Sequence, residues 1–343
     1  MREGAERERG TRVVYFGTPA FAVPALRSLA GRDGFDVVLT VSRPDRPAGR
    51  GQRVQRSEVA AAASQLGIPL FQPESLRTAA TRDRLAAAGA DLFVVAAYGQ
   101  IFGPKVLALP RVACLNVHAS LLPKYRGASP IAAAIAAGDT RTGVSLMVMD
   151  EGLDTGDVIE TVSVPIPPDA TTASLTEDLG DAAAGLVTDT TRRFLTGELV
   201  PVPQRGAASL TRPLVKADGW LDWSRPAPDL SCQVRAMWPW PRAWTTVAGA
   251  GTPVVMQVHA TTAVLTGAPG GPGAPGTVVS IDDAPVVVTA RGLLRLDVVQ
   301  FPGDGPKPGR AMLRAGRIGP GSLIGAEEDG PADRLALVVP VTG

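Results

Sequence analysis

The first half of the chain alternates short apolar runs with helix-like runs, and this order restricts the fold more than any other feature. Residues 92–97 (Leu-Phe-Val-Val-Ala-Ala) are continuously apolar, as expected for a strand buried on both faces. Ser57 precedes an alanine-rich stretch that ends at Gly67, which predicts a capped helix. Further strands are expected at 13–16, 37–41 and 68–71, and further helices at 21–30 and 82–88. This alternation predicts an α/β fold with a doubly wound, mostly parallel sheet, whose sites gather at the carboxyl ends of strands.

The character of the chain changes after residue 196, and its 343 residues exceed what one hydrophobic core usually accommodates. Short β-rich segments follow one another in the second half, a spacing typical of a small barrel: 243–247, 253–258, 277–281, 286–289 and 293–299. We therefore predict a first domain over residues 11–196, a linker over 197–212, a second domain over 213–325 and a tail of unknown role over 326–343.

Asn116 and His118 lie two residues apart in a strand-like apolar run. Side chains on an extended strand alternate between its faces, so these two project together while Leu115 and Val117 project from the other face. An Asn amide can donate to an oxygen that gains negative charge, and an imidazole can donate or shuttle a proton. The pair suits a tetrahedral acyl-transfer intermediate. Taken alone, it equally suits a hydrogen-bonded pair near a strand end.

Asp154 lies in a glycine-containing loop that follows a second strand-like run at 143–149. Gly152 and Gly156 let the backbone of this loop bend tightly. An Asp beside an imidazole would favour the imidazolium and could accept a proton through water. We expect both His118 and Asp154 at the carboxyl ends of strands, although the loop alone is also typical of a solvated acidic turn.

Two long motifs resemble one protein family. The sequence N-V-H-A-S-L-L-P-K-Y-R-G-A-S-P-I at 116–131 and the sequence M-D-E-G-L-D-T-G-D at 149–157 are similar to those of the formyltransferases that use 10-formyltetrahydrofolate. Within this family, R-P-D-R-P-A-G-R-G at 43–51 resembles a loop of the methionyl-tRNA formyltransferase branch. The likeness extends over residues 12–324 and implies a Rossmann-like catalytic domain, here 11–196, followed by an OB-like β-barrel domain, here 213–325.

The resemblance also implies an activity and a catalytic set. The formyl group on N10 of the folate would pass to the α-amino group of methionyl initiator tRNA, for translation initiation. Asn116 and protonated His118 would donate to the oxyanion, and Asp154 would keep His118 charged and help to take the proton of the amine through water.

The same resemblance implies how the formyl donor is held. Four consecutive residues would border the folate: Ser120, Leu121, Leu122 and Pro123. 10-Formyltetrahydrofolate would be a donor consumed in each turnover, and no metal would be required.

Five arginines occupy the fourteen residues of the loop at 43–56. Guanidinium groups so close together repel one another unless an anion is present, which suggests contact with phosphate, although a solvated arginine-rich loop fits the charge equally well. The family likeness implies that this loop inserts against the acceptor arm of the initiator tRNA, through Arg46, Arg50 and Arg53.

The net charge and the cysteine content restrict which binding partners and which cellular compartment the sequence allows. The net charge of +1 excludes a globally basic nucleic-acid binder, so affinity for RNA must come from a local patch. Cys114, Cys232 and two histidines offer no metal-ligand spacing and no disulfide framework. The charged residues 1–10 are not followed by an apolar segment of the signal-peptide kind, and no run has the apolar length of a bilayer span. We expect a cytoplasmic monomer that does not bind membranes.

Four other functions remain as alternatives. A dinucleotide-binding oxidoreductase would need G-x-G-x-x-G after the first strand, where only Gly17 stands. A formyltransferase for an amino-sugar nucleotide would need a uridine pocket in place of the arginine loop, and a formyltetrahydrofolate hydrolase would need only water. A non-catalytic RNA-binding protein on the same scaffold would not need the three polar residues Asn116, His118 and Asp154.

Overall fold

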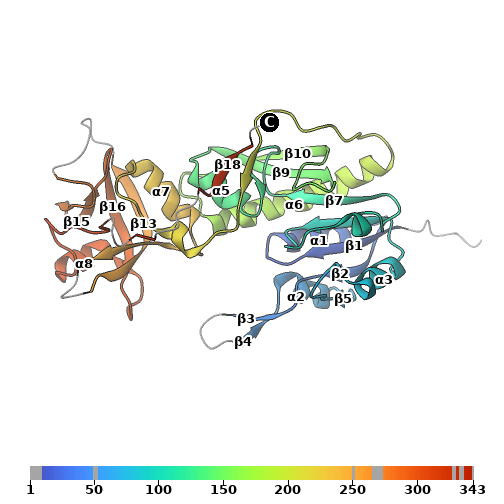
Figure 1. Ribbon diagram of the computed structural model, residues 1–343, viewed down its shortest axis with the longest axis horizontal. Helices are drawn as coiled ribbons and strands as arrows, with labels where there is room; N and C mark the ends of the chain where they lie inside the picture. The colour runs from blue at the N-terminus through green and yellow to red at the C-terminus, as the bar shows by residue number, and fades with distance from the viewer. Residues whose placement is uncertain are drawn as a thin grey trace, which may run out of the picture.

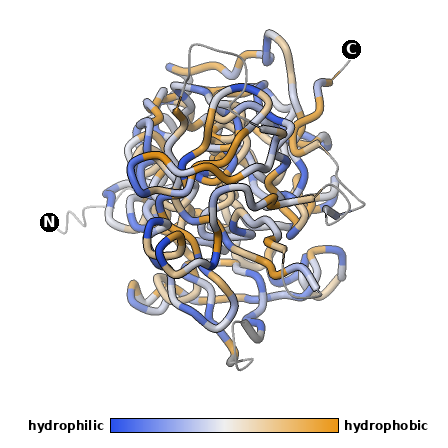
Figure 2. Tube along the Cα trace, turned by 90° about the vertical axis from the view of Figure 1, so that its left-hand side faces the viewer, coloured by the Kyte–Doolittle hydropathy of each residue, from blue (hydrophilic) through white to orange (hydrophobic). Residues whose placement is uncertain are grey.

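The computed structural model describes residues 10–48, 53–248, 252–264, 273–326, 330–331 and 336–341. It has two domains arranged along the long axis of the molecule (Figure 1). Hydrophobic segments lie mostly in the interior of the trace and hydrophilic ones mostly around it (Figure 2). None of the helices in the described ranges is long and apolar enough to cross a membrane.

A seven-stranded sheet forms the centre of the first domain, in the order β10-β9-β7-β6-β1-β2-β5. Its strands are β1 (Thr11–Gly17), β2 (Phe35–Val41), β5 (Leu70–Phe71), β6 (Leu92–Ala96), β7 (Ala113–His118), β9 (Arg141–Val148) and β10 (Val158–Pro165). The five strands from β5 to β7 run parallel, while β9 and β10 run antiparallel to their neighbours. The prediction of a mostly parallel, doubly wound sheet is confirmed.

Helices cover both faces of this sheet. They are α1 (Ala22–Ala30), α2 (Glu58–Gln65), α3 (Ala79–Ala87), α4 (Pro104–Leu107), α5 (Pro130–Ala136) and α6 (Thr172–Leu195). Four of them, α1, α2, α5 and α6, pack on one face, and α3 and α4 pack on the other. Ser57 caps α2 as predicted, because its hydroxyl accepts a hydrogen bond from the backbone of Ala60 at 3.1 Å.

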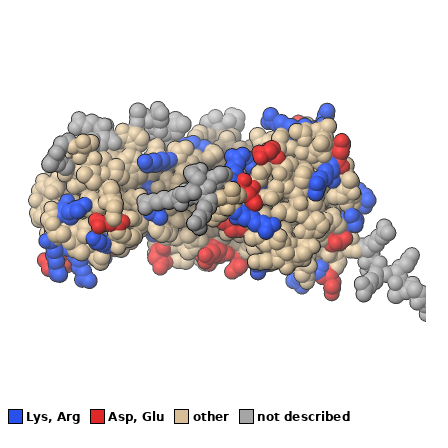
Figure 3. All heavy atoms as spheres, turned by 90° about the horizontal axis from the view of Figure 1, so that it is seen from below, with Lys and Arg blue, Asp and Glu red and all other residues tan. Residues whose placement is uncertain are grey.

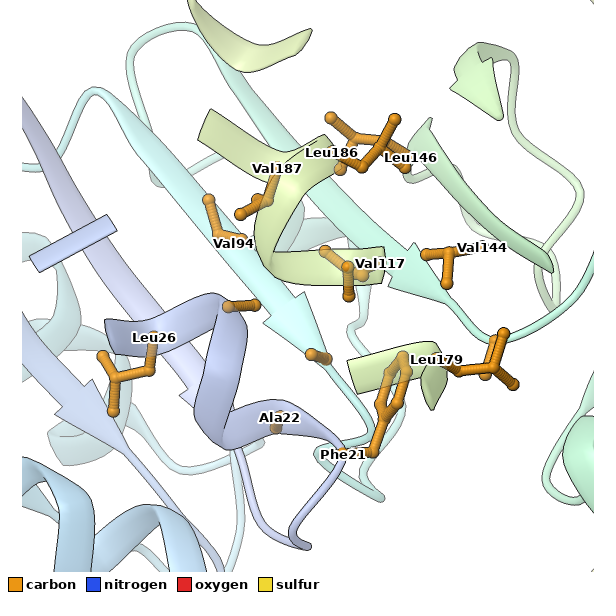
Figure 4. Close-up of a cluster of buried hydrophobic side chains, with 14 of the residues drawn as sticks. Phe21, Ala22, Leu26, Val94, Val117, Val144, Leu146, Leu179, Leu186 and Val187 are labelled. Carbon is orange, nitrogen blue, oxygen red and sulfur yellow. The ribbon is translucent and has the colours of Figure 1, made fainter. Parts of the chain in front are cut away.

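The alternation of side chains along the strands fills both cores. Val94 on β6 and Val117 on β7 face α1 and α6, where they meet Leu26 and Leu179 (Figure 4). Phe93 and the other strand residues that alternate with these pack on the opposite face of the sheet. Asn116 and His118 therefore leave β7 on the face opposite to Val117, as the sequence predicted.

The arginine-rich loop between β2 and α2 contains two short strands that pair with each other, and we call this pair the hairpin. Strands β3 (Arg46–Ala48) and β4 (Arg53–Gln55) pair antiparallel and project from the first domain (Figure 1). Strands of three residues are too short to show a hydrophobic periodicity, so no sequence pattern could reveal this pairing.

The second domain is a curved antiparallel sheet in the order β12-β13-β16-β15-β14, with β17 paired to β16. Its elements are the 3-10 helix η1 (Lys216–Gly219), α7 (Ala227–Ala236), β12 (Ala243–Val247), β13 (Val254–Val264), β14 (Val278–Ile281), β15 (Ala284–Val288), β16 (Leu293–Gln300), β17 (Lys307–Pro308) and α8 (Gly309–Arg314). Residues 321–325 bond to both edges, since Gly325 N donates to Thr246 O and Val278 N donates to Ser322 O, each at 2.8 Å. This segment joins β12 to β14 and completes a ring of hydrogen-bonded backbone, in agreement with the predicted small barrel.

A third, three-stranded sheet joins segments that lie far apart in the sequence, in the order β18-β11-β8. Strand β8 (Arg126–Gly127) lies within the motif at 116–131, β11 (Ser209–Thr211) lies in the predicted linker, and β18 (Val338–Pro340) lies in the predicted tail. Strand β11 runs parallel to β8 and antiparallel to β18. The linker and the tail thus meet on the first domain, next to residues 116–131.

Candidate active site

The three predicted catalytic side chains converge at the end of β7. Asn116 Nδ2 donates to Asp154 Oδ1 at 3.1 Å, and His118 Nδ1 lies 3.6 Å from Asp154 Oδ2. The side chains of His118 and Asp154 are only 7% and 14% exposed, so their interaction is weakly screened by solvent. The amide of Asn116, the imidazole of His118 and the carboxylate of Asp154 therefore lie together at a site that is largely shielded from solvent.

The strand that precedes Asp154 does not end at the carboxyl edge of the parallel strands, where the sequence analysis expected it. Strand β9 runs antiparallel to β7, so the end of β9 is not at the carboxyl edge of the parallel strands. The loop after β9 turns back instead, and Asp154 adopts a left-handed conformation, with φ of 53°. The rule of carboxyl strand ends therefore holds for His118 but not for Asp154.

Backbone groups of the segment after β7 orient the imidazole and the carboxylate. His118 Nε2 lies 2.9 Å from Tyr125 O, which can only accept, so this nitrogen carries a hydrogen. Gly127 N donates to Asp154 Oδ2 at 2.8 Å. The two ring nitrogens of His118 therefore lie near two different oxygen atoms, Tyr125 O at 2.9 Å and Asp154 Oδ2 at 3.6 Å.

Tyr125 is itself fixed firmly, although its backbone is left-handed with φ of 59°. Its hydroxyl donates to Asp139 at 2.8 Å, and its N–H donates to Ser209 Oγ at 2.9 Å. Burial, reinforced by the bond to Asp139, raises the pKa of Tyr125 to about 12, so the phenol stays protonated and keeps this bond. The carbonyl that orients His118 is therefore held from both sides.

A cavity of about 860 Å³ opens in front of Asn116, His118 and Asp154. It lies at the switch point of the sheet, where the chain has moved from one side of β1 to β6 on the other. Residues 97–102 form one wall and residues 149–154 another. Ile101 and Leu153 line it and are 72% and 55% exposed. An organic ligand with a flat apolar part would cover these two side chains.

The residues predicted to border the folate follow directly after Ala119, which lines the cavity, but they are not themselves part of its lining. Ser120 is fully buried; its hydroxyl donates to Lys124 O at 2.5 Å, and its carbonyl accepts from Ser145 Oγ at 2.7 Å. Leu121, Leu122 and Pro123 are partly exposed. Their contact with folate stays a prediction.

The arginines predicted to contact tRNA belong to the hairpin. Arg46 begins β3 and is exposed, and its Nη2 lies 3.9 Å from Oε2 of Glu74, which is also exposed. Arg53 begins β4, and Arg50 lies outside the described residues. On the face seen in Figure 3, basic and acidic side chains are interspersed over both domains. This face of the molecule is therefore not uniformly basic.

The sequence did not single out Gln204 and Thr211, which the structure places beside the active site. Both lie in the predicted linker, where no periodic pattern distinguishes them. Gln204 Nε2 donates to Asp154 O at 2.8 Å, and Thr211 lines the cavity. In the described part of the chain, no group of three or more His, Cys, Asp and Glu side chains could hold a metal ion.

Comparison with known proteins supplies the chemical context of this site. Residues 11–191 match the family model "Formyl transferase", and residues 213–316 match "Formyl transferase, C-terminal domain". The chain is 45% identical over 308 residues to the methionyl-tRNA formyltransferase of Sorangium cellulosum, covering 89% of this chain and 96% of that protein. It is 42% identical over 313 residues to that of Myxococcus xanthus, covering 91% and 97%.

Solved structures share the fold at lower identity. An N-formyltransferase from Helicobacter canadensis, in complex with folinic acid and dTDP-3-aminofucose, matches with a TM-score of 0.59 at 15% identity, over 85% of this chain and 99% of that one. HypX from Aquifex aeolicus in complex with tetrahydrofolic acid matches with a TM-score of 0.55 at 16% identity, over 89% and 47%. At these identities the likeness concerns the fold alone.

Proposed function

The chain belongs to the formyl transferase family, and from this membership we propose how its residues divide the work of the reaction. It transfers the formyl group of a folate donor, 10-formyltetrahydrofolate, to the α-amino group of methionyl initiator tRNA, the step that prepares this tRNA for translation initiation. The observation that carries the division of roles is the convergence of Asn116, His118 and Asp154 at the mouth of the cavity. We propose that the protein acts as a monomer in the cytoplasm, where this substrate is made.

The attacking atom is the α-amino nitrogen of the methionyl group. It forms a bond to the formyl carbon, and the formyl oxygen becomes an oxyanion. The second N–H of Asn116, beyond the one used on Asp154, and the Nδ1–H of His118 are the donors for this oxyanion. Nε2 of His118 is held by Tyr125 O, and Nδ1 lies 3.6 Å from Asp154 Oδ2, too far for a hydrogen bond, so Nδ1 is the nitrogen left to donate to the oxyanion.

Collapse of the tetrahedral intermediate breaks the bond between the formyl carbon and N10 of the folate. The amine loses one proton and N10 gains one, so the reaction consumes no net acid or base. Asp154 is placed to take the proton of the amine through a water molecule, while its charge stabilises the imidazolium of His118. Gly127 N–H and the Asn116 amide keep the carboxylate in position during this step.

The folate occupies the cavity of about 860 Å³, a volume in the usual range for organic ligands. Its pterin ring lies against Ile101 and Leu153, whose exposed apolar surfaces it covers. Ser120, Leu121, Leu122 and Pro123 border it beyond Ala119. Since both polar groups of Ser120 are already bonded within the protein, this residue contributes chiefly by fixing the turn.

The hairpin formed by β3 and β4 provides the contact with tRNA, through Arg46, Arg50 and Arg53. Its projection from the first domain leaves it accessible to a large polyanion (Figure 1).

A formyl-transfer assay tests the proposed function. The protein is incubated with 10-formyltetrahydrofolate and methionyl initiator tRNA, and formylmethionine is measured after hydrolysis of the ester. Uncharged tRNA and an amino-sugar nucleotide serve as control acceptors, and release of formate measures hydrolysis. Transfer to the charged tRNA alone is expected. Transfer to the amino sugar, or release of formate at the same rate without any acceptor, would contradict the proposal.

A further inference from the structure

We propose that Gln204 is a positioning residue for the active-site carboxylate of Asp154. This inference rests on the proposed function and deepens it, because it assigns a role in formyl transfer to a side chain of the interdomain segment. Gln204 lies fifty residues beyond Asp154 and is half-buried against the catalytic loop.

The amide of Gln204 uses both of its ends. Nε2 donates to Asp154 O and to Gly156 O, each at 2.8 Å. Oε1 accepts from Nε and Nη2 of Arg126, at 3.1 and 2.7 Å. Two carbonyl oxygens on one side and a guanidinium on the other fix the orientation of the amide. In the reversed orientation, the amide oxygen would face the carbonyl oxygens and the NH2 group would face the guanidinium donors.

The catalytic loop needs such an external support. Asp154 has a left-handed backbone, which is unfavourable for a residue with a Cβ atom. Two residues later, Gly156 approaches Val148 O so closely that a Cβ atom there would collide with it. The loop is therefore held in a demanding conformation, and the bonds from Gln204 to the carbonyls of Asp154 and Gly156 counter the tendency to relax.

Gln204 also connects the loop to the opposite wall of the site. Arg126, its second partner, directly precedes Gly127, whose N–H donates to Asp154 Oδ2. One side chain thus binds the backbone of Asp154 and the strand that holds the carboxylate of Asp154. It sets the separation of the two walls, on which the 3.6 Å approach of Asp154 Oδ2 to His118 Nδ1 depends.

Loss of the amide donors should misplace the carboxylate without emptying the cavity, since the described lining of the cavity does not include Gln204. We expect Gln204→Ala to lower kcat for methionyl initiator tRNA by about tenfold or more, because small misplacements of catalytic groups are costly. The KM for 10-formyltetrahydrofolate should change by less than about twofold.

A second variant separates the two ends of the amide and guards against misfolding of the first. Gln204→Glu keeps the size of the side chain and an acceptor for Arg126, but it removes both donors to the carbonyls. If the donors position Asp154, Gln204→Glu falls in kcat as far as Gln204→Ala. Full activity of Gln204→Glu would overturn the proposal and leave only the contact with Arg126.

Gln65→Ala is the matched control, since Gln65 also bonds an arginine, Arg27, but lies on the exposed side of α2. All variants are compared at equal concentrations of folded protein. If the wild type and Gln65→Ala formylate the tRNA and Gln204→Ala does so at the same kcat, the inference fails and the proposed function stands. If the wild type itself transfers no formyl group, the proposed function fails.

Discussion

At the scale of single residues, Asp154 is the centre of the site because it accepts from two donors and faces a third group. Asn116 Nδ2 and Gly127 N bond its two oxygens, and His118 Nδ1 lies beside Oδ2. An ionised carboxylate accepts hydrogen bonds from such groups more strongly than a neutral carboxamide of the same shape does. This distinction makes the catalytic assignment testable by substitutions that preserve size.

We expect Asn116→Ala and Asp154→Asn each to lower kcat by about a hundredfold or more. Asn116→Ala removes the proposed oxyanion donor, and Asp154→Asn removes the charge that we propose stabilises the imidazolium. Folate binding should stay nearly intact, because both groups act on charge that develops after binding. Single-turnover rates with methionyl initiator tRNA and a folate titration measure the two quantities. A variant that keeps near wild-type turnover while chemistry limits the rate would show that its residue is not catalytic.

A second residue with a measurable electrostatic role is Asp91, which links β1 to β6. Arg12 N and the Arg111 guanidinium donate to its two oxygens at 2.9 and 2.8 Å. Partial burial raises the pKa of Asp91, but these hydrogen bonds outweigh it and hold the pKa below its usual value. The ionised carboxylate is thus more favourable in the folded than in the unfolded protein.

The stabilisation from Asp91 is therefore fully present above the pKa of an unfolded Asp, about 3.9, and is lost as the pH falls below it. We expect Asp91→Asn to lower the free energy of unfolding at neutral pH and to lose less stability than the wild type between about pH 5 and pH 3. Denaturant titrations across this range measure both effects. The exposed Asp83 provides the control variant Asp83→Asn. Parallel pH curves for the wild type and Asp91→Asn would exclude this role.

At the scale of elements, sequence patterns predicted those parts of the fold that carry local periodicity. The continuous apolar run at β6 and the capped helix α2 are where the sequence placed them. Strands β8, β11 and β18 have only two or three residues each, and they pair across separations of more than 80 residues. Pairing of this kind depends on the packed first domain, so no local pattern could reveal it.

The candidate site likewise contains residues whose placement a local sequence pattern predicts and residues whose placement it does not. Asn116 and His118 share a strand, and their common face follows from the period of two. Asp154 was recognised from its motif, but its approach depends on an antiparallel strand and a left-handed turn. Gln204 had no signal, because a glutamine in a proline-rich segment is ordinary unless the carbonyls that it bonds are known.

The hairpin of β3 and β4 is the element that we expect to set affinity for tRNA. Arg46→Ala and Arg50→Ala should each weaken productive use of methionyl initiator tRNA by roughly 1–3 kcal/mol, with a shallower salt dependence where a phosphate contact is lost. The KM for folate should stay unchanged. Measuring kcat/KM for the tRNA at several salt concentrations tests this, and Arg27→Ala on α1 is the control. Equal salt slopes and equal kcat/KM for all variants would make the hairpin a solvated surface feature.

At the scale of the whole molecule, the two domains are joined in more ways than by the chain itself. Arg235 on α7 donates to Ala170 O at 2.8 Å, and Thr172 Oγ1 donates to Ala236 O at 2.7 Å. After the second domain the chain returns to the first, where Leu337 packs against Tyr125 and β18 pairs with β11. The last strand therefore supports β11, which carries Thr211.

All five tryptophans lie within residues 220–244, so tryptophan fluorescence reports mainly on the second domain. The effect of deleting β18 on the stability of the second domain can therefore be measured separately from its effect on the first. We expect deletion of residues 336–343 to lower the stability of the first domain by roughly 1–3 kcal/mol, because the deletion removes the hydrogen bonds of β18 and the packing of Leu337. The fluorescence transition of the second domain should not move.

Hydrogen exchange measures the local consequence of this deletion. Amides of residues 125–129 and 209–211 should exchange faster, since β11 bonds Tyr125, Ala128 and Ser129 and would lose its outer partner. Turnover should fall with them, because Tyr125 O orients His118 and Gly127 N holds Asp154. Val339→Ser is the matched control, as Val339 is 51% exposed and this change leaves the backbone pairing intact. Unchanged exchange at residues 125–129 after the deletion would show that the last strand covers β11 without supporting the active site.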